Sequence, residues 1–270
     1  MELKSLFKTS NPVIGVVHLL PLPTSARWQG SLSAVVERAV QEAVALASGG
    51  VHGIVVENFF DAPFTKGAVD PAVVSAMTVV ITRLRQLITV PIGINVLRND
   101  AHSGLAIAAC TGAQFIRVNV LTGVMATDQG LIEGDAHSLM RYRRELGAEV
   151  KVFADVLVKH ATPVGCLTSK TALADAVADT IHRGLADAVI VSGVATGQPP
   201  TIQDLRQARS VAGDTPVFIG SGATVDNIAE LMQVANGVIV SSSLKRWGNI
   251  EQPIDPNRVG QFMDALAIRL

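Results

Sequence analysis

The stretch Val217-Phe218-Ile219-Gly220-Ser221-Gly222-Ala223-Thr224 decides the fold, together with its companion Val238-Ile239-Val240-Ser241-Ser242-Ser243. Each is a short β-branched run that stops abruptly in glycine or serine, which is typical of a buried strand before a tight turn. Such small residues let backbone N–H groups approach an anion closely. We expect Thr224 to cap a helix that begins at Val225 and directs its positive dipole at the same place. Two such strand ends late in the chain resemble the phosphate-binding turns after strands 7 and 8 of many (β/α)8 barrels.

Strand and helix patterns alternate along the rest of the chain. The runs that predict strands are residues 12–18, 54–57, 90–95, 114–120, 150–156 and 187–191. Helices are predicted where apolar residues recur at helical spacing or where a capping signal occurs. These segments are 32–47, the segment from Pro71 onward, 101–110, 138–146, 171–182, 202–212 and 256–268. Long loops are expected at 58–69 and 121–135.

About eight strand–helix units with no polar linker predict one domain over residues 1–270, a single (β/α)8 TIM barrel of the α/β class. A doubly wound Rossmann-type sheet is the competing architecture. It predicts a glycine-rich fingerprint after an early strand, whereas the first strand here ends in His18-Leu19-Leu20-Pro21. The barrel is therefore favoured.

Composition narrows the class of protein. Apolar residues make up 49% of the 270 residues and charged residues 17%, and the mean hydropathy is +0.38, which suits a sheet covered on both faces. No run of 18 apolar residues predicts a membrane span, and the amino terminus lacks the apolar core of a signal peptide. A net charge of −1 without a basic block gives no reason to expect nucleic acid as a partner. Cys110 and Cys166, without CxxC spacing, indicate reduced thiols in a cytoplasmic protein.

Polar residues close the otherwise apolar strands, and the carboxyl ends of the strands are where a barrel binds its ligand. Arg117 and Asn119 are two residues apart, so both side chains are expected to point inward. A buried arginine needs an anion, and either Asp155 on the next strand or Glu57 across the barrel fits that need. The alternative is an ion-pair network that only stabilises the barrel.

The catalytic candidates are Glu57 and Asp155 as general acid and base, with Arg117 as electrophile or orienting group. The ligand-binding candidates are His18, Asn58, Asn95, Asn119 and Lys159. Lys159 and His160 can close over the mouth, although a solvated loop is the favoured interpretation. His18 with the two carboxylates offers metal ligands, but HxH and HExxH spacings are missing, so we expect neither a metal nor a cofactor. The sixth strand carries no lysine for a Schiff base, which sets that chemistry aside.

Candidate phosphate-binding residues lie in three glycine- and serine-rich turns. They are Gly193, Thr196 and Gly197 after the sixth strand, Gly220, Ser221 and Gly222 after the seventh, and Ser241, Ser242 and Ser243 after the eighth. Lys245 follows directly, where its ammonium is expected to face the anion. Glycine-rich turns are also common in βα loops that bind nothing, so position on the fold carries this hypothesis.

Several long motifs resemble the BtpA family of photosystem I biogenesis proteins. They are residues 14–23 (IGVVHLLPLP), 56–64 (VENFFDAPF), 95–100 (NVLRND), 115–120 (FIRVNV), 154–156 with Lys159-His160, Ser192-Gly193 with Thr196-Gly197, and 220–222. The resemblance covers almost the full length. It implies a barrel of the ribulose-phosphate-binding group and a role in accumulating photosystem I reaction-centre proteins. It also implies a peripheral location on the cytoplasmic side of the thylakoid membrane, and it brings no accepted catalytic residues.

Two functions of different classes therefore remain open. The resemblance implies a biogenesis or stabilising factor, with the photosystem I reaction-centre proteins or their assembly machinery as partners. The polar rim favours an enzyme or sensor that acts on a phosphorylated small molecule. Apolar loops at 19–23 and 59–64 form either a lid over the site, which we favour, or a surface for a membrane or protein partner. We also expect a homo-oligomer.

Overall fold

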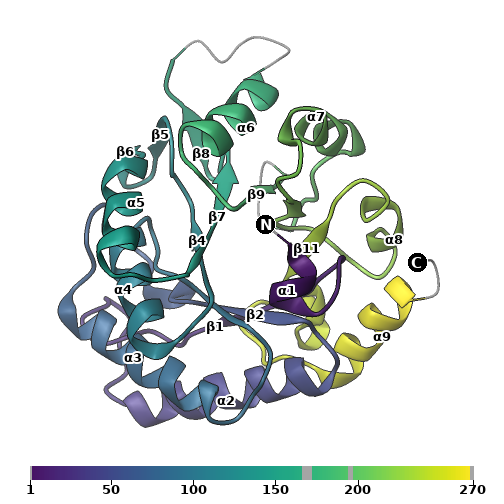
Figure 1. Ribbon diagram of the computed structural model, residues 1–270. Helices are drawn as coiled ribbons and strands as arrows, with labels where there is room; N and C mark the ends of the chain where they lie inside the picture. Colours follow the sequence, from purple (N-terminus) through teal and green to yellow (C-terminus); the bar gives the residue numbers. More distant parts are fainter. Residues whose placement is uncertain (1, 166–171, 194–196, 268–270) are drawn as a thin grey trace.

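The computed structural model describes residues 2–165, 172–193 and 197–267. Eight parallel strands close into a barrel in the order β1-β11-β10-β9-β7-β4-β3-β2, and helices surround it (Figure 1). The barrel strands are β1 (Val13–His18), β2 (Gly53–Glu57), β3 (Ile92–Asn95), β4 (Phe115–Val118), β7 (Lys151–Val156), β9 (Ala188–Val191), β10 (Val217–Ile219) and β11 (Gly237–Val240). The predicted (β/α)8 barrel is confirmed.

The outer helices follow the barrel strands, and most begin at a residue whose side chain caps them. They are α2 (Leu32–Ser48), α3 (Pro71–Arg85), α4 (Ala101–Thr111), α5 (Ala136–Glu145), α6 (Ala172–His182), α7 (Ile202–Ala212), α8 (Ile228–Leu231) and α9 (Pro256–Ala267). The Asp70 carboxylate accepts the Ala72 N–H at the start of α3, and Thr201 with Asp204 forms the predicted capping box of α7. No helix among these described residues is long and apolar enough to cross a membrane.

Alternate residues of the barrel strands point into the barrel and form layers. The layer near the amino ends is aromatic: Phe115 of β4 stacks on Phe153 of β7, which in turn contacts Phe218 of β10. These rings fit because β3 and β11 supply glycine beside them. A methyl group on Gly93 would lie 2.1 Å from the Phe115 ring. The next inward positions along the same strands carry the polar residues of the mouth.

The short helix α1 (Leu3–Phe7) closes the amino end of the barrel. Its Phe7 ring lies edge-on to Phe115 at 5.7 Å and to Phe153 at 6.2 Å. Leu3 and Phe7 are both buried, and they join the cluster of apolar side chains inside the barrel. The interior is therefore a packed core at this end, and only the carboxyl end remains open for a ligand.

Two segments differ from their predicted structure. The loop expected at residues 121–135 contains a hairpin of β5 (Val124–Thr127) and β6 (Gly130–Glu133), and β5 also pairs with β8 (Ala161–Pro163). The helix expected from Val225 with a Thr224 cap begins only at Ile228 and is four residues long. The Asn227 side chain stabilises the turn instead, since it accepts the Thr224 N–H and donates to the Gly222 carbonyl oxygen.

Short 3-10 turns complete the loops at the mouth. They are η1 (Phe59–Asp61) after β2, and η2 (Ser242–Leu244) with η3 (Arg246–Gly248) after β11. After β10 the chain turns at Gly222, whose φ of +73° belongs to the left-handed region. A Cβ there would also lie 2.1 Å from the Pro199 nitrogen, so only glycine fits this turn.

Candidate functional site

A cavity of about 420 Å³ opens at the carboxyl ends of the barrel strands. Of the residues predicted for the site, twelve line it: His18, Glu57, Asn95, Arg117, Asn119, Lys159, Gly197, Gly220, Ser221, Gly222, Ser241 and Ser242. They come from all eight barrel strands or the segments that follow them. The predicted convergence of the strand ends on one cavity is therefore observed.

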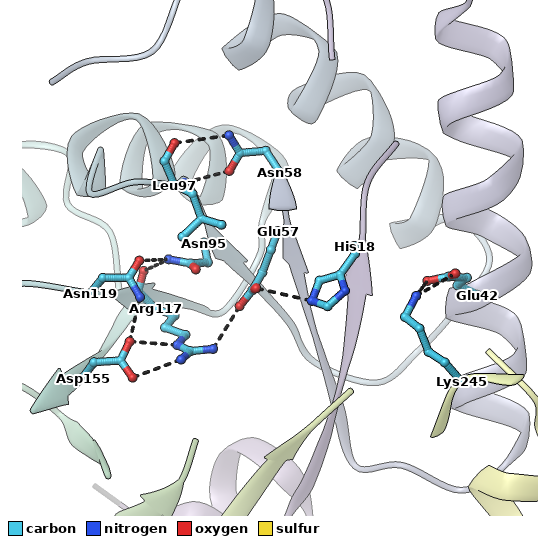
Figure 2. Close-up of polar contacts among 10 residues, drawn as sticks. All are labelled: His18, Glu42, Glu57, Asn58, Asn95, Leu97, Arg117, Asn119, Asp155 and Lys245. Atoms are coloured by element: carbon cyan, nitrogen blue, oxygen red, sulfur yellow. Dashed lines mark hydrogen bonds and ion pairs between the residues drawn. The ribbon is translucent and has the colours of Figure 1, made fainter. Parts of the chain in front are cut away.

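Arg117 forms the centre of a buried charged network (Figure 2). Its Nε and Nη2 atoms donate to the two carboxylate oxygens of Asp155 at 3.0 Å each, and Nη1 donates to Glu57 Oε1 at 3.0 Å. Both expected partners of Arg117 are thus present at once. The bidentate contact with Asp155 fixes the plane of the guanidinium group.

Two asparagines extend the network towards β3. Asn119 Nδ2 donates to Asp155 Oδ2 at 2.8 Å, and Asn95 Nδ2 donates to the Arg117 carbonyl oxygen at 2.9 Å and to Asn119 Oδ1 at 3.1 Å. These donor contacts fix the orientation of the Asn95 amide. Its Oδ1 atom is buried and has no hydrogen-bond partner among the described residues, which leaves an acceptor available to a ligand.

The charge of Arg117 determines the ionisation of Glu57. Burial by itself raises the pKa of Glu57, but the attraction of Arg117, assisted by His18, outweighs it and lowers that pKa to about 2. Burial likewise disfavours the Arg117 cation, yet Asp155 and Glu57 raise its pKa above the ordinary value. At neutral pH Glu57 is therefore a carboxylate and a weak proton acceptor, suited to stabilise positive charge.

His18 lies between this network and an aromatic wall. Its Nε2 atom is 3.6 Å from Glu57 Oε2, and its ring stacks on Phe59 with 4.3 Å between centroids. Burial lowers the pKa of His18 in spite of the neighbouring carboxylate, so the imidazole is neutral at neutral pH. With the proton on Nε2 facing Glu57, the Nδ1 atom is left as a buried acceptor, and the described residues offer it no partner.

Basic residues form another part of the cavity wall. Lys159 and His160 follow β7 and both line the cavity, so they do not form the purely solvated loop that the sequence favoured, although His160 is also exposed to solvent. Arg98, which sequence reasoning missed, also lines the cavity, and its Nη2 atom donates to the Lys159 carbonyl oxygen at 3.0 Å. A lone arginine in a loop carries no periodic signal, and its only sequence clue was the position three residues after the end of β3.

The phosphate-binding candidates are divided between the cavity and the loops behind it. Ser241 Oγ is buried at the cavity and has no partner in the described part of the chain. Gly193 and Ser243 do not line the cavity. Gly193 packs against the Gln198 carbonyl oxygen, and the Ser243 hydroxyl donates to the Ala223 carbonyl oxygen at 2.7 Å. Thr196 lies outside the described residues.

Asn58 serves the loops rather than the cavity. Its Oδ1 atom accepts the Leu97 N–H at 2.7 Å, and its Nδ2 atom donates to Asp61 Oδ2 at 3.0 Å (Figure 2 shows the Leu97 contacts). Asp61 in turn accepts the Leu22 N–H at 2.7 Å. These bonds join the loops after β1, β2 and β3, so Asn58 positions the rim and does not contact the space inside it.

Lys245 does not face the mouth, contrary to the expectation from its sequence position. It is fully buried outside the barrel, where its Nζ atom donates to Glu42 Oε1 at 3.0 Å and Oε2 at 3.1 Å (Figure 2). Arg38 also donates to Glu42, at 2.8 Å. The turn η2 redirects the chain after Ser241, so Lys245 joins α2 to the segment after β11 and stabilises the fold.

The apolar mouth loops cover the site in part. Phe59 and Phe64 line the cavity, while Leu19 and Leu22 are buried in the core. This arrangement agrees with the lid interpretation of these loops. No group of three or more His, Cys, Asp or Glu side chains that could hold a metal ion occurs within residues 2–165, 172–193 and 197–267.

Comparison with known proteins adds a family match, two relatives and a solved structure with the same fold. A sequence model described as "BtpA family" matches residues 9–268. The chain is 68% identical to "Photosystem I biogenesis protein BtpA" of Synechocystis over 99% of this chain and 92% of that protein. It is 45% identical to "Uncharacterized protein TK2179" of Thermococcus kodakarensis, over 94% of each chain. N-(5'-phosphoribosyl)anthranilate isomerase from Pyrococcus furiosus superposes with a TM-score of 0.58 at 16% identity, covering 96% of this chain and 99% of the other, which shows a shared barrel fold.

Proposed function

Because the chain belongs to the BtpA family, we propose that it is a photosystem I biogenesis factor that supports accumulation of the reaction-centre proteins. The observation that carries this proposal is the 68% identity to the Synechocystis biogenesis protein over 99% of the chain. The reaction-centre proteins, or the machinery that assembles them, are then the partners.

Complementation tests the biogenesis role. A Synechocystis strain that lacks its 68%-identical relative is given this chain, and photosystem I reaction-centre proteins are measured by immunoblot and low-temperature fluorescence. We expect restoration to the level of the parent strain. A strain in which the chain accumulates without raising photosystem I above the deletion level would refute the proposal.

A second function is favoured by the cavity itself: an enzyme or sensor for a phosphorylated small molecule. A buried charged network and unpartnered acceptors are costly in a scaffold, and a ligand that satisfies them offsets that cost. In this role Gly220, Ser221, Gly222, Ser241 and Ser242 hold the phosphate. Glu57, a carboxylate at neutral pH, and Asp155 hold the Arg117 guanidinium group, which orients the reacting group. His18 beside them transfers protons, and Asn95 and Asn119 bind the rest of the ligand. The Thermococcus relative, 45% identical, has a name that assigns it no role in photosystem I.

Ligand-dependent melting tests this second function. Ribose 5-phosphate, ribulose 5-phosphate, glyceraldehyde 3-phosphate and inorganic phosphate are screened against their unphosphorylated counterparts. A ligand at ten times its Kd stabilises the folded state by about 1.4 kcal/mol, or roughly 3 to 5 °C in Tm for a chain of this size. We expect such a shift with a phosphorylated compound only. Equal shifts with ribose and ribose 5-phosphate, or no shift with any of them, count against the phosphate site.

Location and assembly follow from the same proposal. We place the protein in the cytoplasm, peripheral to the thylakoid membrane and homo-oligomeric. Flotation of the wild type and of Phe60→Ser with thylakoid-lipid vesicles tests the membrane contact, and sedimentation equilibrium tests the oligomer. Because the Phe60 ring contacts His18 and Phe59, the lid interpretation predicts unchanged flotation but an altered ligand-induced Tm shift in Phe60→Ser.

A further inference from the structure

The Lys159 side chain places in the cavity an amine that has no hydrogen-bond or ion-pair partner among the described residues. Lys159 follows β7, and the bond from Arg98 Nη2 to its carbonyl oxygen fixes its backbone beside the mouth. The side chain is largely withdrawn from solvent and lines the cavity. Within the part of the chain that the structure describes, its Nζ atom forms no hydrogen bond or ion pair.

Lys245, which is fully buried, is a lysine with a structural role and serves as a comparison. Lys245 Nζ donates to both oxygens of Glu42, so its charge is compensated where it is buried. Among the residues that the structure describes, Lys159 has no carboxylate within ion-pair distance, while Arg117 pairs with both Glu57 and Asp155. The two lysines therefore differ in chemistry: one is held as a cation, and the other has an available nitrogen.

The surroundings of Lys159 favour its uncharged form. Burial lowers its pKa most, and the Arg117 cation lowers it further. Glu57 and Asp155 act in the opposite direction, Arg98 adds a small lowering, and the net shift is downward. Desolvation next to another cation is the arrangement that makes a lysine amine nucleophilic at neutral pH. A lysine that only bound an anion would gain nothing from a lowered pKa.

The rest of the lining indicates what such an amine would meet. His18 Nδ1 and Asn95 Oδ1 are buried acceptors, and no described residue donates to either of them. Acceptors of this kind are satisfied by ligand hydroxyl groups. Ser241 Oγ, also unpartnered, lies at the turn after β11 together with the small residues after β10, where a phosphate group fits. The cavity thus combines hydroxyl, phosphate and amine chemistry.

We propose that Lys159 forms an imine with the carbonyl carbon of a hydroxylated, phosphorylated aldehyde or ketone bound in this cavity. The uncharged amine attacks the carbonyl carbon, one amine proton and one further proton pass to the carbonyl oxygen, and the carbinolamine expels that oxygen as water. A C=N bond replaces the C=O bond, and hydrolysis reverses the step, so no oxidant or reductant is needed. This proposal rests on the phosphorylated-ligand site of the second proposed function.

Reductive trapping tests the imine without knowledge of the natural ligand. The intact protein is incubated at pH 7 with glyceraldehyde 3-phosphate or ribose 5-phosphate and cyanoborohydride, and the modified lysines are located by peptide mass spectrometry. A lowered pKa raises the free-amine fraction of Lys159 at neutral pH, and a bound sugar phosphate holds its carbonyl group beside this amine. We therefore expect Lys159 to be trapped several-fold faster than the exposed Lys66, and Lys245 not at all. The phosphorylated sugar should exceed its unphosphorylated counterpart.

Two variants separate a nucleophile from a simple cation. Lys159→Arg keeps a positive charge but cannot form the imine, so it should lose the adduct while keeping a ligand-induced Tm shift. Lys66→Arg, at an exposed site, should leave the Lys159 adduct unchanged. Labelling of Lys159 at the same rate as Lys66 overturns the imine, and so does an absence of adduct with every sugar phosphate.

The same experiment distinguishes this inference from the function on which it rests. A Tm shift with a sugar phosphate but no adduct on Lys159 refutes the imine and leaves the phosphorylated-ligand site standing. Neither a Tm shift nor an adduct refutes both. Trapping that excess inorganic phosphate suppresses supports both, because phosphate would then compete at the turns after β10 and β11.

Discussion

Arg117 controls the chemistry of the mouth because it neutralises two carboxylates at once. Its removal would leave Glu57 and Asp155 buried without compensation, a situation that typically costs about 3 to 5 kcal/mol. At neutral pH the guanidinium group and Glu57 stay charged, so proton transfer falls to groups beside them. His18, with its unpartnered Nδ1, and the amine of Lys159 are the available candidates.

Acid titration tests the state of Glu57. Its pKa in the folded protein is about 2 against an ordinary 4.5, so the unfolded chain binds the proton more readily between those values. Stability from this group is therefore complete above pH 4.5 and is lost as the pH falls towards 2, in total about 3 kcal/mol. Urea unfolding from pH 6 to 3 should show a shallower decline in Glu57→Gln than in the wild type. The exposed-site variant Glu149→Gln is the control and should decline like the wild type. Parallel declines in Glu57→Gln and the wild type would contradict the lowered pKa of Glu57.

The Lys245–Glu42 pair gives a prediction about stability alone. Lys245→Met should lower the free energy of unfolding by about 3 kcal/mol, since it leaves Glu42 buried with only Arg38 to compensate it. Adding Glu42→Leu removes the uncompensated charge and should recover much of that loss. Urea titration of the single and double variants measures the difference. A double variant as unstable as the sum of the two single variants would show that the pair does not act as described.

Residue roles were predictable where strand geometry controls them. The two-residue spacing of Arg117 and Asn119 places both in the barrel, and the need of a buried cation for an anion identifies its partners. Lys245 and Ser243 were misplaced because each follows a strand through a 3-10 turn whose direction no periodicity encodes. The position of Asn58 was predicted at the rim, but its contacts with Leu97 and Asp61 depend on loops distant in the sequence.

Among the elements, the β3–β4 contact shows how the barrel accommodates large aromatic rings. The Phe115 ring occupies the space that a side chain on Gly93 would need. In an ordinary strand, glycine is a weak choice because it lacks a side chain to pack. Here it is required by the neighbouring ring, and Gly237 beside Phe218 repeats the arrangement.

Paired glycine substitutions test this packing. Gly93→Ala should destabilise the protein by about 1 to 3 kcal/mol, because the new methyl group overlaps the Phe115 ring. Gly260→Ala in α9 is the control: nothing lies within 4 Å of the added atom, so it should stabilise by about 0.5 to 1 kcal/mol. Thermal unfolding distinguishes the two. A gain in stability for Gly93→Ala would refute the close packing.

The alternation of strands and helices was predictable because buried parallel strands are short continuous apolar runs, whereas amphipathic helices repeat apolar residues every three to four positions. The capping residues Asp70 and Thr201 were recognisable because a cap depends only on residues adjacent in the sequence. The β5–β6 hairpin was missed because its strands are short and half-exposed and therefore lack a continuous apolar run. Helix α8 was predicted too early, since the Asn227 side chain, not a Thr224 cap, stabilises the preceding turn.

For the whole molecule, we infer a single folding domain. Every barrel strand pairs with two neighbours, and β1 pairs with β11, so the amino- and carboxyl-terminal halves share one sheet. Helix α1 further joins the amino terminus to β4 and β7 through Phe7. Differential scanning calorimetry should therefore show one transition with equal calorimetric and van't Hoff enthalpies. Two separable transitions would indicate independent units.

We propose that the biogenesis role inferred from the family depends on ligand binding in the cavity at the barrel mouth. Photosystem I content in the complemented Synechocystis strain tests it most directly, with Ser241→Asp as the cavity variant. A carboxylate at Ser241 would repel an anion at the turn after β11, where the hydroxyl now lacks a described partner. We expect Ser241→Asp to accumulate as a folded protein with a cooperative, somewhat lowered melting transition and to leave photosystem I at the deletion level, while the surface variant Lys66→Glu restores it. Full restoration by Ser241→Asp would contradict the claim.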